Sequence, residues 1–205
     1  YNINKKKKGV IFIKVIFLDF DGVLNGYNRK IHFVFKIARK FHFIKFLNSI
    51  YDVFGIRTFK VFLLKLICIF TNSKVVLSSS WRNAYYIPYK ENGTRGKELI
   101  RKFKFFHIPV IGKTPKTINS KRELEIKEYL EKHKDIKNFI ILDDESFDIK
   151  EYYPNNLILT SDDENLIGTC LDNSGLRLKH VFKAIHILRS DIQYGDKTYI
   201  SKWFN

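Results

Sequence analysis

Residues 10–22 read Val-Ile-Phe-Ile-Lys-Val-Ile-Phe-Leu-Asp-Phe-Asp-Gly, an apolar run that ends in two carboxylates and a glycine. The apolar part, Val10–Leu18, contains a single polar residue and is continuous rather than alternating. This pattern is typical of a central parallel strand that is covered on both faces. Ligand sites of open α/β sheets lie beyond the carboxyl ends of such strands. We therefore expect Asp19 and Asp21 at a functional site, where Gly22 lets the chain turn sharply.

The pattern Asp-x-Asp-Gly also occurs in simple turns and in calcium-binding loops. An EF-hand needs further oxygen ligands and a glutamate at the end of its loop. Here Val23, Leu24 and Asn25 follow instead, which disfavours the calcium loop. A buried carboxylate needs a metal, a cation or several hydrogen bonds. Whether residues 19–22 form a simple turn or a functional site therefore depends on which such groups the rest of the chain supplies.

Two further strand-like runs also end in polar groups. Lys74–Leu77 is followed by Ser-Ser-Ser-Trp-Arg at 78–82, and Phe139–Leu142 by Asp-Asp-Glu at 143–145. Between them, residues 120–123 resemble a capping box that opens a helix. The apolar spacing after it, at Ile126, Tyr129, Leu130 and His133, places Arg122 on the buried side of the helix start. Carboxylates, hydroxyls and one cation are thus predicted to meet at one edge of the sheet.

This ordered set of motifs resembles the haloacid dehalogenase (HAD) superfamily of phosphotransferases. The first family motif matches residues 19–24, and the hydroxyl motif falls at Ser78 or Ser79. The basic motif falls at Arg122, with Lys121 as the second choice, and the acidic motif at residues 143–144. Segments 77–82, 112–115, 122–126 and 142–144 are similar to the HAD domain of "Swiss Army Knife" RNA repair proteins, over about residues 12–189.

The predicted fold is a Rossmann-like three-layer α/β/α sandwich with a mainly parallel sheet, as a single domain over residues 1–205. A small cap insertion is expected at about residues 23–52. The resemblance implies a Mg²⁺-dependent phosphohydrolase that acts through an aspartyl-phosphate intermediate, on a nucleic-acid end or a nucleotide phosphate. Two alternatives stay open: a small-metabolite phosphatase, and a catalytically idle nucleic-acid-binding module.

The resemblance also implies a role for each site residue. Asp19 would be the nucleophile, and Asp21 the general acid and then the general base. The phosphate would be bound by Ser78 or Ser79 and by Arg122, which would also hold Asp19 ionised. The expected Mg²⁺ ligands are Asp19, the backbone carbonyl of Asp21, and Asp143 or Asp144. The expected substrate contacts are Arg82 and Lys121.

Each of these residues also has a structural interpretation. Residues 78–80 could form an ordinary strand-end turn, and Asp143 with Asp144 could simply begin a loop. Arg122 could be a solvated residue of a first helical turn, and Arg82 a surface residue beside a buried Trp81.

The chain carries 37 basic and 21 acidic residues, a formal net charge of +16. Such a charge suggests a polyanionic partner such as RNA or DNA, although an AT-rich genome would also enrich lysine. Residues 29–46 interleave basic and aromatic side chains, which suits nucleic-acid binding or a plain amphipathic helix with a solvated lysine face.

The remaining features predict a cytoplasmic protein with no membrane span. Cys68 and Cys170 lack metal-ligand spacing and are expected to pack as small apolar residues in a reducing compartment. Lys5–Lys8 before the first apolar run resembles a signal peptide, but the run ends in aspartates rather than at a cleavage site. Val61–Phe70 is short and contains Lys65, which indicates a core helix.

The other predicted elements complete the order along the chain. They are a helix over 54–70, a loop over 83–96, a helix over 96–105, a strand over 107–111, a strand over 157–159 and a helix over 176–189.

Overall fold

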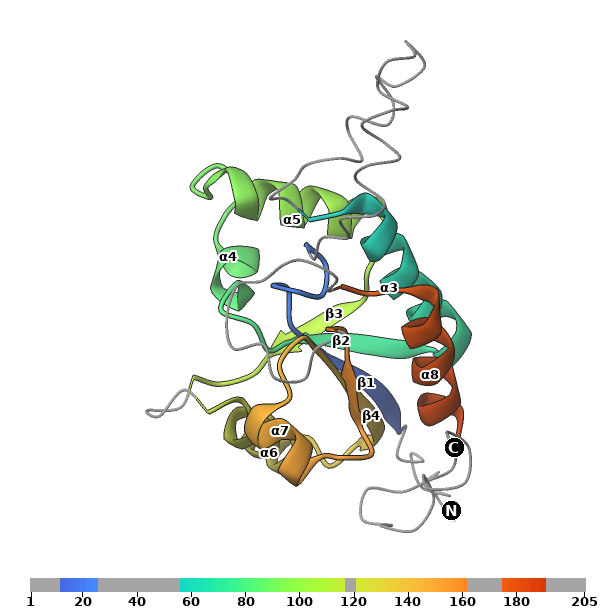
Figure 1. The fold of residues 1–205 in the computed structure, drawn as a ribbon. Coiled ribbons are helices and arrows are strands. Elements are labelled where there is room, and N and C mark those ends of the chain that lie inside the picture. Colours follow the sequence, from blue (N-terminus) through green and yellow to red (C-terminus); the bar gives the residue numbers. More distant parts are fainter. Residues whose placement is uncertain (1–11, 26–55, 117–120, 162–174, 191–205) are drawn as a thin grey trace, which may run out of the picture.

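The computed structural model describes residues 12–25, 56–116, 121–161 and 175–190, which form a five-stranded parallel sheet with helices on both faces (Figure 1). The strands are β1 (Ile13–Leu18), β2 (Ser73–Leu77), β3 (Val110–Lys113), β4 (Ile136–Asp143) and β5 (Leu157–Leu159). The helices are α3 (Thr58–Thr71), α4 (Arg82–Tyr86), α5 (Thr94–Phe105), α6 (Arg122–Lys132), α7 (Phe147–Tyr152) and α8 (Leu178–Arg189). The predicted Rossmann-like fold class is confirmed.

The strand order β3-β2-β1-β4-β5 puts β1 in the centre, with β2 on one side and β4 on the other. The chain builds outward from β1 to β3 and then returns to continue with β4. A crevice forms where the winding direction of such a sheet reverses, beyond the carboxyl ends of the strands. Here that position is the end of β1.

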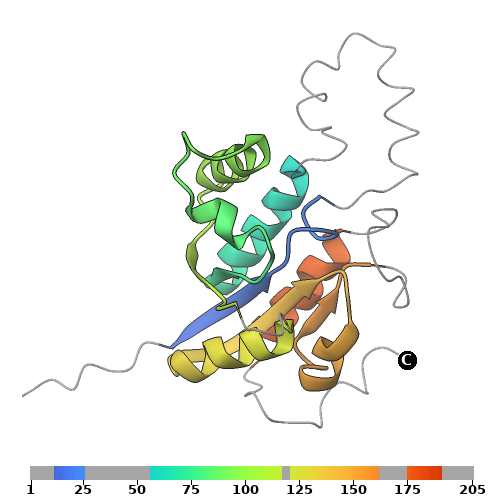
Figure 2. The ribbon, with the colours of Figure 1, turned by 90° about the vertical axis from the view of Figure 1, so that its left-hand side faces the viewer.

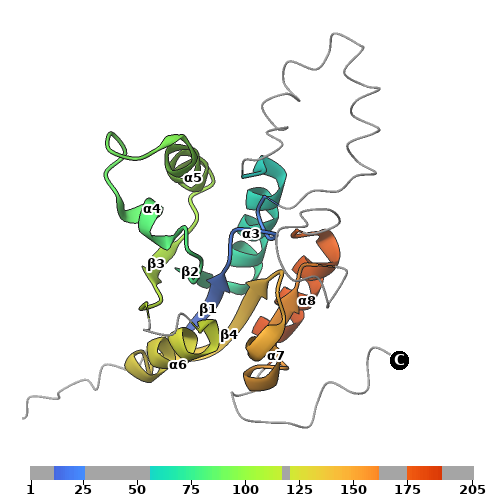
Figure 3. The same cartoon turned by 60° about the vertical axis from the view of Figure 1, so that its left-hand side comes forward.

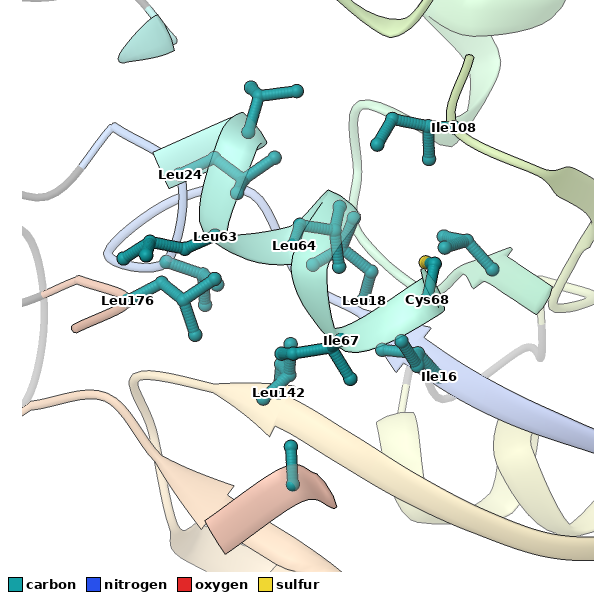
Figure 4. Close-up of a cluster of buried hydrophobic side chains, with 14 of the residues drawn as sticks. Ile16, Leu18, Leu24, Leu63, Leu64, Ile67, Cys68, Ile108, Leu142 and Leu176 are labelled. Atoms are coloured by element: carbon teal, nitrogen blue, oxygen red, sulfur yellow. The ribbon is translucent and has the colours of Figure 1, made fainter. Parts of the chain in front are cut away.

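Alternate residues of each central strand enter two separate cores. Ile16 and Leu18 of β1 pack with α3, α5 and α8, whereas Val15 and Phe17 pack with α6 and α7. Figure 2 shows α6 lying across one face of the strands, and Figure 4 shows α3 covering the other face with its leucines. Both faces of β1 are therefore apolar, which explains its continuous apolar sequence.

Most predicted elements are present with small shifts in their bounds. The predicted strand at 107–111 begins instead at Val110, because the end of α5 continues through a turn. His107 has a φ of 49°, and the backbone N–H of Ile108 donates to the carbonyl of Phe103. The predicted loop over 83–96 contains α4 and the start of α5.

The predicted capping box is wrong in its register. The N-cap of α6 is Lys121, which makes no side-chain capping hydrogen bond, and its carbonyl accepts the first helical bond from Glu125. Ser120 lies outside the described residues. So do residues 26–52 of the predicted cap insertion, the basic-aromatic segment 29–46, and Cys170. Cys68 is buried as predicted, and burial raises the pKa of its thiol to about 11.

Candidate active site

The site lies at the carboxyl ends of the three central strands. The backbone N–H of Asp19 donates to the carbonyl of Leu142 at 3.0 Å, and that of Ser78 donates to the carbonyl of Leu18 at 3.0 Å. The sheet hydrogen bonds thus continue past the strands and fix the residues that follow them. Asp143 is itself the last residue of β4. This is the convergence that the strand-end motifs predict.

Three carboxylates form a tight cluster there. Asp19, Asp143 and Asp144 each offer an oxygen, and these oxygens lie within 4.8 Å of one another. Asp143 is fully buried and Asp19 is 4% exposed. Among the described residues, the cation that pairs with them is Arg122, whose Nη2 lies 3.2 Å from Asp19 Oδ1 and whose Nη1 contacts Asp143 Oδ2. Three carboxylates therefore share one guanidinium.

This imbalance changes the pKa values of the cluster. Burial and then the charge of Asp143 raise the pKa of Asp19 well above its usual value, although Arg122 opposes them. Burial and Asp143 likewise raise the pKa of Asp144 to about 7. Burial opposes the charge of Arg122, but Asp143 and Asp19 outweigh it and raise its pKa above the usual value. Arg122 acts on Asp19 in the expected direction, because it lowers the pKa of that carboxyl, but burial and the neighbouring carboxylates outweigh it.

A divalent cation would supply the missing positive charge. The cluster offers only oxygen ligands, few of them from the protein, which is the donor set that Mg²⁺ prefers. The observed residues therefore fit the expected metal, with Asp19, Asp143 and Asp144 as the carboxylates that would hold it. Both members of the Asp143–Asp144 pair qualify, where the sequence had left the choice open.

Asp21 is placed differently from the other aspartates. Its carboxylate is exposed and accepts hydrogen bonds from Asn25 Nδ2 at 2.7 Å and from Trp81 Nε1 at 2.9 Å. The carboxylate does not belong to the metal cluster, so only the backbone carbonyl of Asp21 stays a candidate ligand. Two donors hold the carboxylate in a fixed orientation beside Asp19, as a proton-transfer group requires.

Gly22 is required by both its backbone and its surroundings. Its φ is +65°, and a Cβ built on it would lie 1.8 Å from Asp144 Oδ2. Its N–H donates to Asn25 Oδ1 at 2.8 Å, and its carbonyl accepts from Thr160 Oγ1 at 3.0 Å. The glycine thus lets the turn after β1 approach the acidic motif directly. Asn25 and Thr160 carry no motif of their own, so the sequence did not single them out.

The two candidate hydroxyls differ in their partners. Ser79 Oγ accepts a hydrogen bond from the backbone N–H of Trp81 at 3.3 Å. Ser78 Oγ is buried and, within the described part of the chain, has no hydrogen-bond partner. A buried hydroxyl without a partner costs free energy unless a ligand satisfies it. Ser78 is therefore the hydroxyl that fits a phosphate oxygen.

Arg82 and Trp81 are the reverse of what the sequence predicts. Arg82 is buried, and its guanidinium forms a bidentate ion pair with Glu125, at 2.5 and 3.0 Å. Its Nη1 also donates to Thr114 Oγ1 at 2.8 Å. Trp81 is the partly exposed neighbour. The expectation that Arg82 is a surface residue or a substrate contact is corrected, because the interior carboxylate of Glu125 holds it. Lys121 is exposed at the N-cap of α6, and its contact with substrate stays a prediction.

Comparison with known families agrees with this geometry. Residues 15–167 match the family described as the HAD domain in Swiss Army Knife RNA repair proteins. The match begins within β1, continues through β5 and includes every residue of the carboxylate cluster. No curated protein and no solved structure matches the chain. In the described part of the chain, no helix is both long enough and apolar enough to cross a membrane.

Proposed function

Because this chain belongs to the HAD family found in Swiss Army Knife RNA repair proteins, we propose that it is a Mg²⁺-dependent phosphohydrolase that acts through an aspartyl-phosphate intermediate. One observation carries the proposal: Asp19 is buried against Asp143 and Asp144, and Arg122 contacts it. A purely structural cluster has no need of three carboxylates at one cation. A catalytically idle binding module is disfavoured for the same reason.

In the first step, a carboxylate oxygen of Asp19 attacks phosphorus, and the bond from phosphorus to the leaving oxygen breaks. Asp21 donates its proton to that oxygen, so the leaving group departs as a neutral alcohol. Arg122 and the hydroxyl of Ser78 bind the phosphoryl oxygens. When bound, Mg²⁺ would neutralise charge on the phosphoryl group and on the carboxylates.

In the second step, Asp21 accepts a proton from a water molecule, and the water oxygen attacks the same phosphorus. The bond from phosphorus to the Asp19 oxygen breaks, which restores the carboxylate and releases inorganic phosphate. Asp21 is thereby protonated again and ready for the next substrate. The hydrogen bonds from Asn25 and Trp81 suit this double role, because they hold the carboxylate in one place through both proton transfers.

The proposed substrate is a phosphorylated RNA or DNA end or a nucleotide. The net charge of +16 and the role named in the family description support this choice. The alternative is a small-metabolite phosphatase, which the same residues could serve. A cytoplasmic location and a single domain over residues 1–205 stay predictions.

The test is release of inorganic phosphate from aryl phosphate, mononucleotides, and RNA and DNA with 3′- or 5′-terminal phosphates, each with Mg²⁺ and with excess chelator. We expect Mg²⁺-dependent release and binding of beryllofluoride at Asp19. Full activity in excess chelator would contradict the proposed metal. Equal efficiency on oligonucleotides and mononucleotides at low salt would favour the small-metabolite alternative.

A further inference from the structure

An exposed tyrosine and an exposed lysine form a cation–π pair beside the candidate active site. Tyr86, the last residue of α4, is 48% exposed, and Lys113 Nζ lies 5.0 Å from the centre of its ring. Lys113 Nζ also donates to Asn83 Oδ1 at 3.2 Å. Tyr86 packs edge-on against Tyr85 at 5.3 Å, and Tyr85 packs against the buried Phe103. We call Asn83, Tyr86 and Lys113 the α4–β3 surface.

This surface lies, like the active site, at the carboxyl ends of the strands. Lys113 ends β3 and is paired in register with Leu77, the residue before Ser78. It therefore lies at the same edge of the sheet as Asp19, two strands away. Figure 3 shows α4 and β3 together on the β2 side of β1. Along the chain, the exposed residues Lys116 and Lys121 lie between Lys113 and the catalytic Arg122.

The charge around the α4–β3 surface suits a polyanion. Residues 82–116 contain nine basic residues and two acidic ones. Arg82 is buried against Glu125, and the buried Lys102 is paired with Glu98, so seven basic residues and one acidic residue stay outside these two ion pairs. A second pair of the same kind follows α4, where Lys97 Nζ lies 5.9 Å from the ring centre of the half-exposed Tyr89. Interleaved lysines and exposed aromatic rings are how proteins bind single strands, because lysines contact phosphates and rings stack on bases.

We propose that the α4–β3 surface binds the nucleotides next to the phosphorylated end of a single-stranded nucleic acid. Tyr86 stacks on a base, and Lys113 contacts a backbone phosphate while the terminal phosphate sits at Asp19. The proposal rests on the proposed function, because it gives a binding site to the part of the substrate that the catalytic residues do not reach. It differs from the expectation for residues 29–46, since every residue of the α4–β3 surface is described and lies beside the site.

The test compares binding in two double variants. Y86L with K113Q removes the ring and the charge from the α4–β3 surface and keeps apolar bulk. K104Q with Y152L makes the same two changes elsewhere: Lys104 lies on α5 before the amino end of β3, and Tyr152 ends α7 on the β5 side. All four side chains are exposed, which makes the pairs a matched set. Neither pair includes a residue of the catalytic cluster.

The probe is a fluorescein-labelled single-stranded 12-nucleotide RNA with a terminal phosphate, titrated by anisotropy at several salt concentrations. Both pairs are placed on an Asp19→Asn background so that the probe is not hydrolysed. We expect the α4–β3 pair to raise Kd about tenfold and to flatten the salt slope by about 0.7, the loss of one phosphate contact. The control pair should leave both values unchanged. An unchanged Kd in the α4–β3 pair, or an equal loss in the control pair, overturns the proposal.

A separate measurement keeps the two proposals apart. With Asp19 intact, the α4–β3 pair should hydrolyse aryl phosphate within about twofold of the wild-type rate, because that ester reaches only the catalytic residues. If wild-type protein hydrolyses no phosphate ester, the proposed function fails, whereas the binding titration still tests the surface. A loss of aryl phosphatase activity in the α4–β3 pair counts against a role confined to the flanking nucleotides.

Discussion

Two buried charged groups each include one residue of the first turn of α6, Glu125 in one and Arg122 in the other, and they are balanced differently. Glu125 pairs with Arg82 through two bonds, with Thr114 Oγ1 close to both partners. One turn earlier, Arg122 is, in the described part of the chain, the one cation paired with the three carboxylates of the catalytic cluster. The Arg82–Glu125 pair is complete without a ligand, whereas the catalytic cluster has an excess of negative charge.

The two groups therefore have different roles within one helical turn: the Arg82–Glu125 pair is structural, and the catalytic cluster is built to bind a cation. A buried ion pair whose partners satisfy each other fixes the elements that carry it, here α4, α6 and the end of β3. An unbalanced cluster keeps its raised pKa values until a cation arrives. The Arg82–Glu125 pair thereby fixes the start of α6 and, with it, the position of Arg122. Removing a carboxylate from each group should have opposite effects on stability.

The largest expected effect is on catalysis in Asp19→Asn. Loss of the nucleophile should lower phosphate release by about 10³-fold or more. The free energy of unfolding in chelator should stay the same or rise, because the change removes a carboxylate that burial and Asp143 already disfavour. Assays of phosphate release and urea unfolding check both parts. Activity within tenfold of wild type would rule out the covalent mechanism.

On the balanced side, Glu125→Gln should lower the free energy of unfolding by about 3 kcal/mol, because it leaves the buried guanidinium of Arg82 without its counter-ion. The matched control is Glu128→Gln on the same helix, where Glu128 pairs with Lys132 at the surface. The control should cost less than about 1 kcal/mol. Urea unfolding measures both variants, and equal losses would mean that Arg82–Glu125 is no more important than a surface pair.

Addition of Mg²⁺ should stabilise the folded protein through the unbalanced cluster. At about 100 times Kd the gain is about 2.7 kcal/mol, because the ion binds only the assembled carboxylates. Asp143→Asn should lose most of this gain, whereas Glu125→Gln should keep it from a lower starting stability. Thermal unfolding with and without Mg²⁺ measures the increment. An equal increment in wild type and Asp143→Asn would place the bound ion elsewhere.

The smallest expected effect is on the pH dependence of the metal-free protein. The pKa of Asp144 is raised from its ordinary value of 3.8 to about 7, so the folded state binds more protons than the unfolded state between these values. The contribution of Asp144 to stability is therefore present below pH 4 and is lost as the pH rises toward 7. Asp144→Asn should flatten this fall in unfolding experiments in chelator. A slope that is the same in the variant and in wild type would assign the fall to other groups.

The sequence predicts the unbalanced cluster better than the balanced pair. Asp19, Asp143 and Arg122 follow buried strands or begin a helix, so periodicity alone places them at one edge of the sheet. Arg82 and Glu125 are 43 residues apart, and no local sequence pattern predicts their contact. The outward carboxylate of Asp21 escapes prediction for another reason. Strand alternation ends at Leu18, and the turn at Gly22 redirects the chain.

The bounds of β3 could not be predicted from the sequence either, again because they depend on contacts outside the strand. A four-residue edge strand with alternating exposure carries too weak an apolar signal to fix its ends. The turn through His107 that delays its start depends on hydrogen bonds with α5. The α4–β3 surface also depends on this register, because a shift of one residue would turn Lys113 to the other face of the sheet.

The close approach of Gly22 to Asp144 also bears on the order in which the protein folds. These residues lie 122 positions apart in the sequence, and they meet only when β4 has docked beside β1. Contacts of such long range form slowly, because a long loop must close first. A nascent or truncated chain that lacks β4 cannot assemble the carboxylate cluster, whatever local structure it holds. We therefore expect protection by Mg²⁺ to appear late in refolding, which makes the ion a reporter of completed sheet assembly.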